Sequence, residues 1–291
     1  MDDSLAPALH GKKILVTGGS LGLGLASAHA CLKRGARVAI CARTLSDLEN
    51  AKRELEAASG TAVPAIEADM SEAVDVTRTF DEAERRLGTL DGVIHAAGIY
   101  GPIGPITDIE PQAWLAAITV NLFGTFLVAR EAAGRLKRSG GGRIVLYAGG
   151  GAATPFPNYT AYASGKAAVV RFCETIAIEL APYNIEVNAL SPGFVATRFH
   201  QQTLAAGASA AGNEFLARTE AELAKGGVPA RVGADCAAFL VSDAARGITG
   251  KFVAAPYDGY ADWPRHVAEL RSSDIFTLRR ILPKERGLDW Q

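Results

Sequence analysis

The sequence predicts an α/β protein built on a doubly wound parallel sheet. Short, nearly continuous apolar runs rich in β-branched residues alternate with longer helical stretches along most of the chain. A glycine-rich turn joins the first apolar run to the helix that follows it. Apolar runs of this kind are typical of parallel strands covered on both faces, and right-handed crossovers place the connecting helices on both sides. We therefore expect a three-layer sandwich.

The order of elements follows from this alternation. Strands are expected at 13–17, 37–41, 63–67, 90–95, 143–147, 186–190 and 252–255. Helices are expected at 23–34, 46–58 and 74–87, from 110 onward, and at 159–181. Ser46 and Glu49 have the spacing of a capping box, which predicts that the second helix begins there.

Length and composition favour a single domain. The chain has 291 residues, of which 48% are hydrophobic, so it can bury a large core. Two segments stand outside the alternation, an insert at 199–227 and a C-terminal extension at 260–291. Neither is long enough to form an independent core. We expect one domain over 1–291, with the insert acting as a lid over the substrate.

Charge and cysteine usage narrow the partners. The formal net charge is −1, which favours a small-molecule substrate over nucleic acid or an anionic membrane. Cys31, Cys41, Cys173 and Cys236 fit neither a zinc spacing nor a disulfide framework, so no metal is expected and the first three are interpreted as buried apolar residues. Residues 1–13 lack the apolar core of a secretory signal, and no apolar stretch is expected to reach transmembrane length. A cytoplasmic location follows.

The glycine-rich turn predicts a dinucleotide site. Residues 17–24 read Thr17-Gly18-Gly19-Ser20-Leu21-Gly22-Leu23-Gly24, between a strand and a helix. Glycines permit a tight turn and close approach of the backbone to a pyrophosphate. The helix N-terminus offers unpaired N–H groups to the same anion. The strand, turn and helix together provide the context that this mechanism requires.

The end of the second strand bears on which dinucleotide is bound. It reads Cys41-Ala42-Arg43-Thr44, where NAD sites carry an acidic residue for the ribose. Arg43 would pair with a 2′-phosphate, with Thr44 beside it; the alternative is a solvated loop arginine. This favours NADP, with NAD possible. Asp69, after the third strand, either accepts from the adenine amino group or caps the next turn.

A tyrosine and a lysine four residues apart form the candidate catalytic pair. Tyr162 and Lys166 lie at the start of a predicted helix, and their spacing puts them on one face. An ammonium beside a phenol lowers the pKa of the phenol. A tyrosine tuned in this way transfers a proton to or from a carbonyl or alcohol oxygen.

Taken together, four motifs resemble the short-chain dehydrogenase/reductase family in its compact single-domain branch. In order they are Thr17-Gly18-x-x-x-Gly22-x-Gly24, Asn121 in Val120-Asn121-Leu122, Tyr162-x-x-x-Lys166, and Ser191-Pro192-Gly193-x-x-x-Thr197. The resemblance covers residues 10–260. It implies a Rossmann-type fold, NAD(P), and hydride transfer between the cofactor and a carbonyl or secondary alcohol.

The resemblance also implies roles for individual residues. Tyr162 would be the general acid/base, Lys166 would hold the nicotinamide ribose, and Asn121 would anchor a proton-relay water. The residues after the sixth strand would cradle the nicotinamide. The expected cofactor-binding residues are Gly18, Ser20, Leu21, Gly22, Leu23, Gly24, Arg43, Thr44, Asp69, Met70, Ala96, Gly98, Tyr162, Lys166, Pro192, Gly193, Val195 and Thr197.

The chain departs from the family pattern at Gly149. The family usually carries a serine thirteen residues before the tyrosine, hydrogen-bonded to the substrate oxygen, and glycine has no hydroxyl. Loss of one donor to a reacting oxygen costs about 100- to 1,000-fold in rate. Tyr147 and Thr154 are candidates to replace it.

A second departure follows the fourth strand, which ends in His95-Ala96-Ala97-Gly98. The family usually has asparagine at the position of Ala96. Gly98 is kept, so close approach to the adenosine ribose survives. His95 is interpreted as a packed or bracing residue.

These features favour an NADP-dependent carbonyl reductase or alcohol dehydrogenase. Two alternatives stay open. The first is a weakly active or inactive dinucleotide-binding sensor or scaffold, which Gly149 favours. The second is an epimerase or dehydratase that uses transient oxidation. The helix over 167–181 is apolar nearly all round, so we expect burial on both sides. In the family that the chain resembles, such a helix commonly forms a dimer interface, so the resemblance implies a homodimer or homotetramer.

Overall fold

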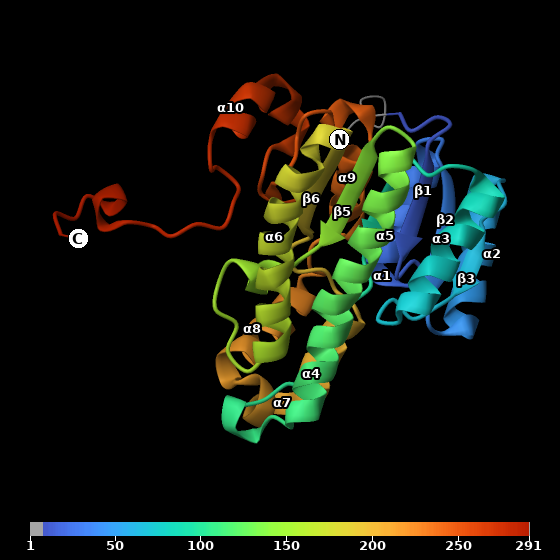
Figure 1. Ribbon diagram of the computed structural model, residues 1–291. Coiled ribbons are helices and arrows are strands. Elements are labelled where there is room, and N and C mark those ends of the chain that lie inside the picture. Colours follow the sequence, from blue (N-terminus) through green and yellow to red (C-terminus); the bar gives the residue numbers. More distant parts are fainter. Residues whose placement is uncertain (1–7, 291) are drawn as a thin grey trace.

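The computed structural model describes residues 8–290 and contains a parallel sheet flanked by helices (Figure 1). Seven strands are ordered β3-β2-β1-β4-β5-β6-β7. Their bounds are β1 Lys13–Thr17, β2 Arg37–Ala42, β3 Ala65–Glu67, β4 Gly92–His95, β5 Gly142–Tyr147, β6 Ile185–Ser191 and β7 Phe252–Ala254. The doubly wound parallel sheet is therefore confirmed. Residues 1–7, part of the segment in which no secretory signal is expected, lie outside the described residues, as does residue 291.

Helices cover both faces of the sheet. They are α1 Gly22–Lys33, α2 Leu45–Ser59, α3 Ala73–Leu87, α4 Pro111–Ile118, α5 Gly124–Arg138, α6 Thr160–Leu180, α7 Arg198–Ala211, α8 Asn213–Ala224, α9 Ala230–Leu240 and α10 Val267–Ser272. Buried side chains of α1, α2 and α9 form one core cluster with one face of the sheet. Those of α3, α5 and α6 form a second cluster with the opposite face. This is the expected three-layer sandwich.

The strand register places the site. In β1, Thr17 pairs with Cys41 of β2 on one side and with His95 of β4 on the other. The last residue of β5, Tyr147, pairs with Leu190 of β6. The loops that follow β1, β2, β4, β5 and β6 therefore leave the same edge of the sheet. In open α/β sheets this carboxyl-terminal edge is where ligands bind.

Some predicted boundaries are wrong. The capping box at Ser46 does not form, because α2 begins one residue earlier, at Leu45, with Thr44 at the N-cap and no side-chain cap hydrogen bond. Strand β3 begins at residue 65 rather than 63. The Val63 amide donates to Glu56 Oε1 at 2.9 Å, and the next residue is a proline, which has no N–H to pair.

The expectation that no stretch reaches transmembrane length also needs correction. The continuous helical run Pro111–Arg138 is long and apolar enough to span a membrane by length and composition. Its inner side packs against the sheet through residues that include Val128 and Ala132. Its outer side exposes Leu115 and Phe123. The run is thus a core helix of the sandwich with a partly exposed apolar face.

The C-terminal extension packs in part on the body. Trp263 and Leu270 are buried in the first core cluster. The Phe252 amide of the edge strand donates to the Phe276 carbonyl at 2.8 Å. Beyond residue 278 the chain runs away from the body (Figure 1).

Candidate active site

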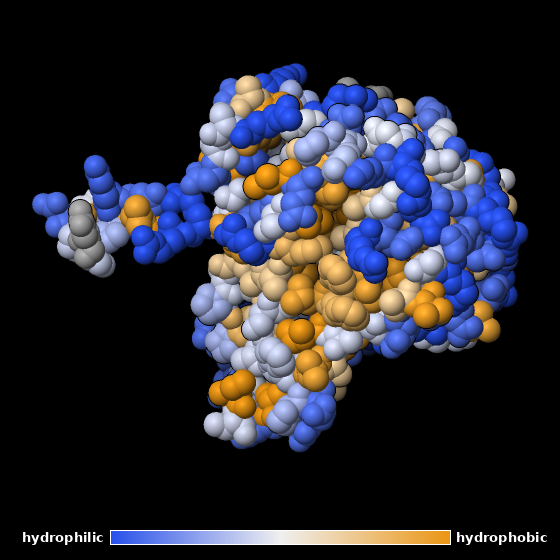
Figure 2. All heavy atoms as spheres, in the orientation of Figure 1, coloured by the Kyte–Doolittle hydropathy of each residue, from blue (hydrophilic) through white to orange (hydrophobic). Residues whose placement is uncertain are grey.

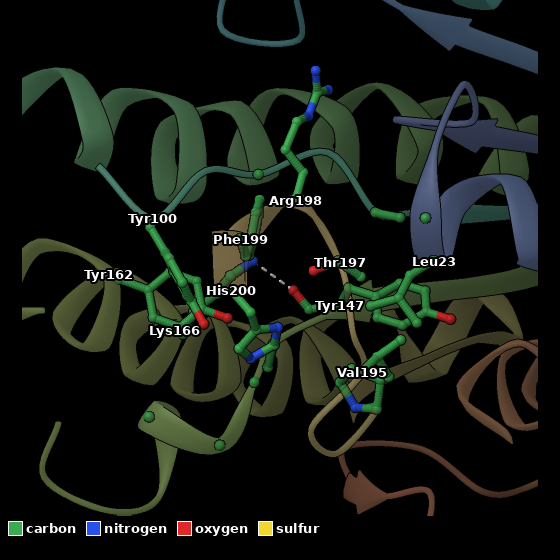
Figure 3. A pocket seen from close by; sticks show the side chains of 18 of the residues that line it. Leu23, Tyr100, Tyr147, Tyr162, Lys166, Val195, Thr197, Arg198, Phe199 and His200 are labelled. Carbon is green, nitrogen blue, oxygen red and sulfur yellow. Dashed lines mark hydrogen bonds between the residues drawn. The ribbon is translucent and has the colours of Figure 1, made fainter. Parts of the chain in front are cut away.

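A cavity of about 1170 Å³ lies at the carboxyl-terminal edge of the sheet. It is lined by the loops after β1, β2, β4, β5 and β6 and by helices α7 and α8, which form the segment expected to act as a lid (Figure 3). All the residues expected to bind the cofactor line it. The structure thus brings them together, although they come from segments up to about 180 residues apart in the sequence.

The glycine turn has the shape that a dinucleotide needs. Gly18 has φ +66°, and a Cβ there would lie 2.7 Å from the Ala97 nitrogen. A Cβ at Gly24 would lie 2.1 Å from the Gly18 carbonyl oxygen, so the turn closes only without side chains. The first turn of α1 has no side-chain cap and no acidic residue. Its amides remain available to an anion, and the turn therefore fits a pyrophosphate.

Further along the cavity, two more contacts bound the space for the cofactor. A Cβ at Gly98 would lie 2.9 Å from Asn121 Oδ1 and 3.4 Å from Lys166 Nζ. Residue 98 therefore packs closely on Lys166, expected at the nicotinamide ribose, and on Asn121, expected to anchor a proton-relay water. A Cβ at Gly22 would meet only Thr197 Cγ2, at 3.6 Å. The glycine turn and the loop after β6 thus face each other across the cleft.

At the expected adenosine end, Arg43 is half exposed, and its Nη1 lies 3.7 Å from Asp69 Oδ2. Asp69 Oδ1 accepts hydrogen bonds from the Ser71 amide and hydroxyl, at 2.9 and 2.7 Å, so it caps a turn. Thr44 makes no side-chain capping bond to α2. Arg43 and Thr44 both line the cavity.

The lid adds a basic residue that the sequence did not indicate. Arg198, the first residue of α7, lines the same cavity. Its Nη1 lies 4.0 Å from Asp47 Oδ2 in the first turn of α2. The position of Arg198 in the cavity depends on how α7 packs in the folded chain, and no local sequence pattern indicates this.

The candidate catalytic pair is buried at the start of α6. Tyr162 is 8% exposed and Lys166 is 4% exposed. Lys166 Nζ donates to the Tyr147 carbonyl oxygen at 2.8 Å and lies 5.9 Å from the centre of the Tyr162 ring. Burial lowers the pKa of Lys166 to about 8. Burial also raises the pKa of Tyr162, so the predicted lowering by the lysine is wrong for this arrangement.

Asn121 is held by the backbone of the loop after β4. It lies in a π-helical turn, Thr119–Phe123, and is fully buried. Its Oδ1 accepts from the Ile99 amide at 3.0 Å, and its Nδ2 donates to the Ile99 carbonyl at 2.8 Å. Asn121 is not among the residues that line the cavity. In the described structure it fixes the loop that carries Gly98.

His95 braces the sheet beside the site, as its position at a strand end indicated. It is 1% exposed, and its Nδ1 is hydrogen-bonded to Thr17 Oγ1 at 2.7 Å. Burial lowers its pKa to about 3, with the Lys166 charge adding to the shift. The ring is therefore neutral at physiological pH and links β1 to β4.

Neither candidate for the missing hydroxyl faces Tyr162. The Tyr147 hydroxyl is hydrogen-bonded to Ser27 Oγ at 2.9 Å. In Figure 3 the Tyr147 side chain lies at the right, and Tyr162 lies at the left. Thr154 is exposed, and its Oγ1 donates to the Gly150 carbonyl at 3.1 Å. A Cβ at position 149 would lie 2.5 Å from the Tyr162 hydroxyl oxygen.

An aromatic wall closes the other end of the cavity. Its rings contact one another edge to face or stacked and belong to Tyr100, Phe156, Tyr162, Phe199 and Phe215, and Tyr159 packs against them without lining the cavity. His200 of the lid joins it, with its ring 3.8 Å from that of Phe194 and a buried Nδ1 that lacks a partner among the described residues. The sequence did not indicate this wall, because its members come from three separate segments.

Comparison with known proteins agrees with the site. A family profile described as short chain dehydrogenase matches residues 12–207. The chain is 35% identical to 2-(S)-hydroxypropyl-CoM dehydrogenase 3 from Xanthobacter autotrophicus, over 83% of this chain and 94% of that protein. It is 35% identical to NADPH-dependent aldehyde reductase 2, chloroplastic, from Arabidopsis thaliana, over 85% and 93%. The structure of NAD+-bound xylitol dehydrogenase superposes with a TM-score of 0.78 at 27% identity, over 84% and 98%.

Proposed function

Because the chain belongs to the short-chain dehydrogenase/reductase family, we propose that it transfers hydride between NADP(H) and a carbonyl or secondary alcohol of a small molecule. The observation that carries this proposal is the position of Tyr162 and Lys166. Both lie in the same cavity as a glycine turn that fits a pyrophosphate. A protein that only bound the dinucleotide would have no use for a buried phenol and a buried ammonium at that point.

Tyr162 and Lys166 have different roles in the reaction. When bound, the nicotinamide supplies or accepts the hydride. In the reductive direction the Tyr162 hydroxyl gives its proton to the carbonyl oxygen. Lys166, oriented by the Tyr147 carbonyl, holds the ribose and stabilises the phenolate that forms. Because burial raises the pKa of Tyr162, the protonated form that reduction requires predominates.

The preference for NADP over NAD rests on Arg43. The relatives use both cofactors: the printed name of one specifies NADPH, and the solved structure of another contains NAD+. Arg43 replaces the acidic residue of NAD sites, and its half-exposed guanidinium makes one long ion pair among the described residues, 3.7 Å from Asp69 Oδ2. A charged hydrogen bond to a phosphate contributes about 1.5–3 kcal/mol, or roughly 10- to 150-fold in affinity.

The aromatic wall supports a substrate with an apolar, ring-bearing body. Tyr100, Phe199 and Phe215 present ring faces and edges to the cavity, and aromatic pairs of this kind prefer other rings. Tyr162, which belongs to this wall, supplies the hydrogen-bonding hydroxyl. We expect the carbonyl to point there, with the ring system under the lid.

A substrate screen tests the proposal. Aromatic and aliphatic aldehydes, ketones and alcohols are followed by nicotinamide absorbance with NADPH, NADP+, NADH and NAD+. We expect turnover of ring-bearing ketones, with a lower KM for NADPH than for NADH. Arg43→Ala should raise the KM for NADPH at least tenfold and leave that for NADH unchanged. The matched control is Arg53→Ala, which removes an exposed arginine of α2 that bonds Asn50.

Other outcomes would assign a different function. Cofactor binding without turnover on any compound would contradict the proposal in favour of a binding protein. Tight retention of cofactor with no net redox change would favour an epimerase or dehydratase. An unchanged cofactor preference in Arg43→Ala would contradict the NADP assignment alone.

We also propose that the protein acts in the cytoplasm as a homodimer or homotetramer. The outer surface of α4, α5 and α6 exposes large apolar side chains, visible as an orange and tan band in Figure 2. Ile178 of α6 is 78% exposed, and the Phe123 and Phe126 rings stack 5.9 Å apart. The predicted burial of α6 on both sides is wrong for a single chain, and a second copy would supply it.

A further inference from the structure

The reacting oxygen of a substrate in this site has one evident hydroxyl donor. Tyr162 supplies it, and Gly149 cannot supply a second. A Cβ at residue 149 would lie 2.5 Å from the Tyr162 hydroxyl oxygen. The tyrosine therefore occupies the space in which a side chain at position 149 would begin. A second donor has to come from elsewhere in the cavity wall.

Most hydroxyls around the cavity already have partners. Tyr147 is bonded to Ser27, and Thr154 donates to its own turn. The Tyr159 hydroxyl donates to Thr203 Oγ1 of the lid at 2.8 Å. Tyr100 differs from these, because no hydrogen bond to another residue in the described part of the chain engages its hydroxyl. It lines the cavity and is otherwise buried, at 4% exposure.

The position of Tyr100 is suited to donating a hydrogen bond to the reacting oxygen. Its ring meets the Tyr162 ring edge to face, with the centroids 4.8 Å apart and the planes at 87°. Figure 3 shows the two side chains converging, with both hydroxyl groups at the same end. Burial raises the pKa of Tyr100, and the neighbouring Tyr162 and Tyr159 side chains add to the rise, so its hydroxyl keeps its proton and serves as a donor.

Tyr100 is also held rigidly. Asn121 bonds both the amide and the carbonyl of Ile99, the preceding residue. The Tyr100 ring packs against Phe199, at 4.7 Å, and against Tyr159, at 5.1 Å. A fixed donor aimed at developing negative charge stabilises a transition state without reorganisation.

We propose that Tyr100 donates the second hydrogen bond to the reacting oxygen, in place of a hydroxyl at position 149. This assignment rests on the proposed function. During reduction the substrate carbon gains a hydride, and the oxygen gains the Tyr162 proton. Tyr100 keeps its own proton, stabilises the charge that develops on the oxygen, and leaves the balance of the reaction unchanged.

Tyr100→Phe tests the assignment, with Tyr159→Phe as the matched control. Both variants remove one hydroxyl from a buried ring, but Tyr100 lines the cavity and Tyr159 does not. We expect kcat for the best ketone to fall about 100- to 1,000-fold in Tyr100→Phe. Tyr159→Phe should stay within about threefold of the wild type. NADPH affinity, measured by fluorescence titration, should be unchanged in both variants, which shows that the fold and cofactor site are intact.

A binding measurement supplies a readout independent of turnover. The same ketone is titrated calorimetrically into the wild type and both variants, with NADP+ present so that no reduction occurs. Tyr100→Phe should weaken binding at least fivefold, and Tyr159→Phe should not. Equal affinities together with equal kcat values would overturn the assignment. So would a higher KM with unchanged kcat, because Tyr100 would then bind the substrate away from the reacting oxygen.

Failure of the proposed function would look different. In that case the wild type itself would turn over no compound of the screen. The calorimetric comparison would still show whether Tyr100 binds a carbonyl oxygen. The experiments therefore distinguish failure of the Tyr100 assignment from failure of the proposed function.

Discussion

Tyr162 and Lys166 lie in a more apolar setting than their sequence spacing indicated. The spacing predicted one helix face, and the structure agrees, since both side chains enter the same cavity. It did not predict the depth of burial, which dominates the pKa of each group. Because burial lowers the pKa of Lys166 to about 8, this side chain begins to lose its proton just above neutral pH. Tyr162 stays protonated there, because burial raises its pKa. This combination favours proton donation, and so reduction.

The pH dependence of reduction follows from Lys166. Burial lowers its pKa to about 8, so the ammonium is present below pH 8 and is lost as the pH rises through that value. We expect kcat/KM for ketone reduction to be level below pH 7.5 and to fall up to tenfold per pH unit above pH 8. Lys166→Arg, which keeps its charge, should move the decline to higher pH. A wild-type profile level to pH 10 would contradict this role.

Among the elements, those with local sequence patterns were predicted well. Each strand was an apolar run, and the glycine turn required a strand before it and a helix after it, which β1 and α1 provide. The aromatic wall could not be predicted. Tyr100, Tyr159 and Phe199 belong to separate loops and helices, and only tertiary packing brings their rings together. The boundary of α2 was missed because helix starts depend on tertiary contacts as well as on capping residues.

The C-terminal extension has two parts, which contact the body differently and meet at residue 279. Before 279 it is anchored: the buried Lys251 Nζ donates to the carbonyls of Ser273 and Ile275, at 3.1 and 2.9 Å. The Leu278 amide donates to Glu174 Oε1 at 2.6 Å. From residue 279 on, the described contacts are within the extension itself: Arg279 pairs with Asp274 and Glu285.

Two truncations test this division. A chain ending at residue 272 leaves the buried groups of Lys251 and Glu174 without these partners, which should cost roughly 1–3 kcal/mol of unfolding free energy. A chain ending at residue 279 keeps every anchor and should match the full chain. Urea unfolding monitored by fluorescence measures both. Equal stability of the two truncated chains would show that the anchors contribute nothing.

For the whole molecule, the exposed apolar band on α4, α5 and α6 is the feature that one chain does not explain. It combines Leu115, Phe123, Phe126 and Ile178, all at least 40% exposed. Patches of this kind on soluble proteins mark association surfaces, and a twofold axis would pair the band with itself. The sequence indicated an oligomer through α6 alone, whereas the structure extends the surface to two neighbouring helices.

A charge placed in the band should break the oligomer. Phe126→Glu is expected to reduce the mass measured by light scattering to that of a smaller assembly, because the carboxylate would be buried without a partner. Leu45→Glu is the control, since Leu45 is 52% exposed on α2, which covers the opposite face of the sheet. It should leave the mass unchanged. A wild-type protein that is monomeric at all concentrations would contradict the proposed assembly.

The central claim is that the bound dinucleotide reacts through Tyr162. The most direct measurement is single-turnover oxidation of NADPH by the best ketone, comparing the wild type with Tyr162→Phe at equal cofactor saturation. We expect the variant to bind NADPH with unchanged affinity and to lose at least 100-fold in the rate of hydride transfer. A variant that oxidises NADPH at the wild-type rate would contradict the account.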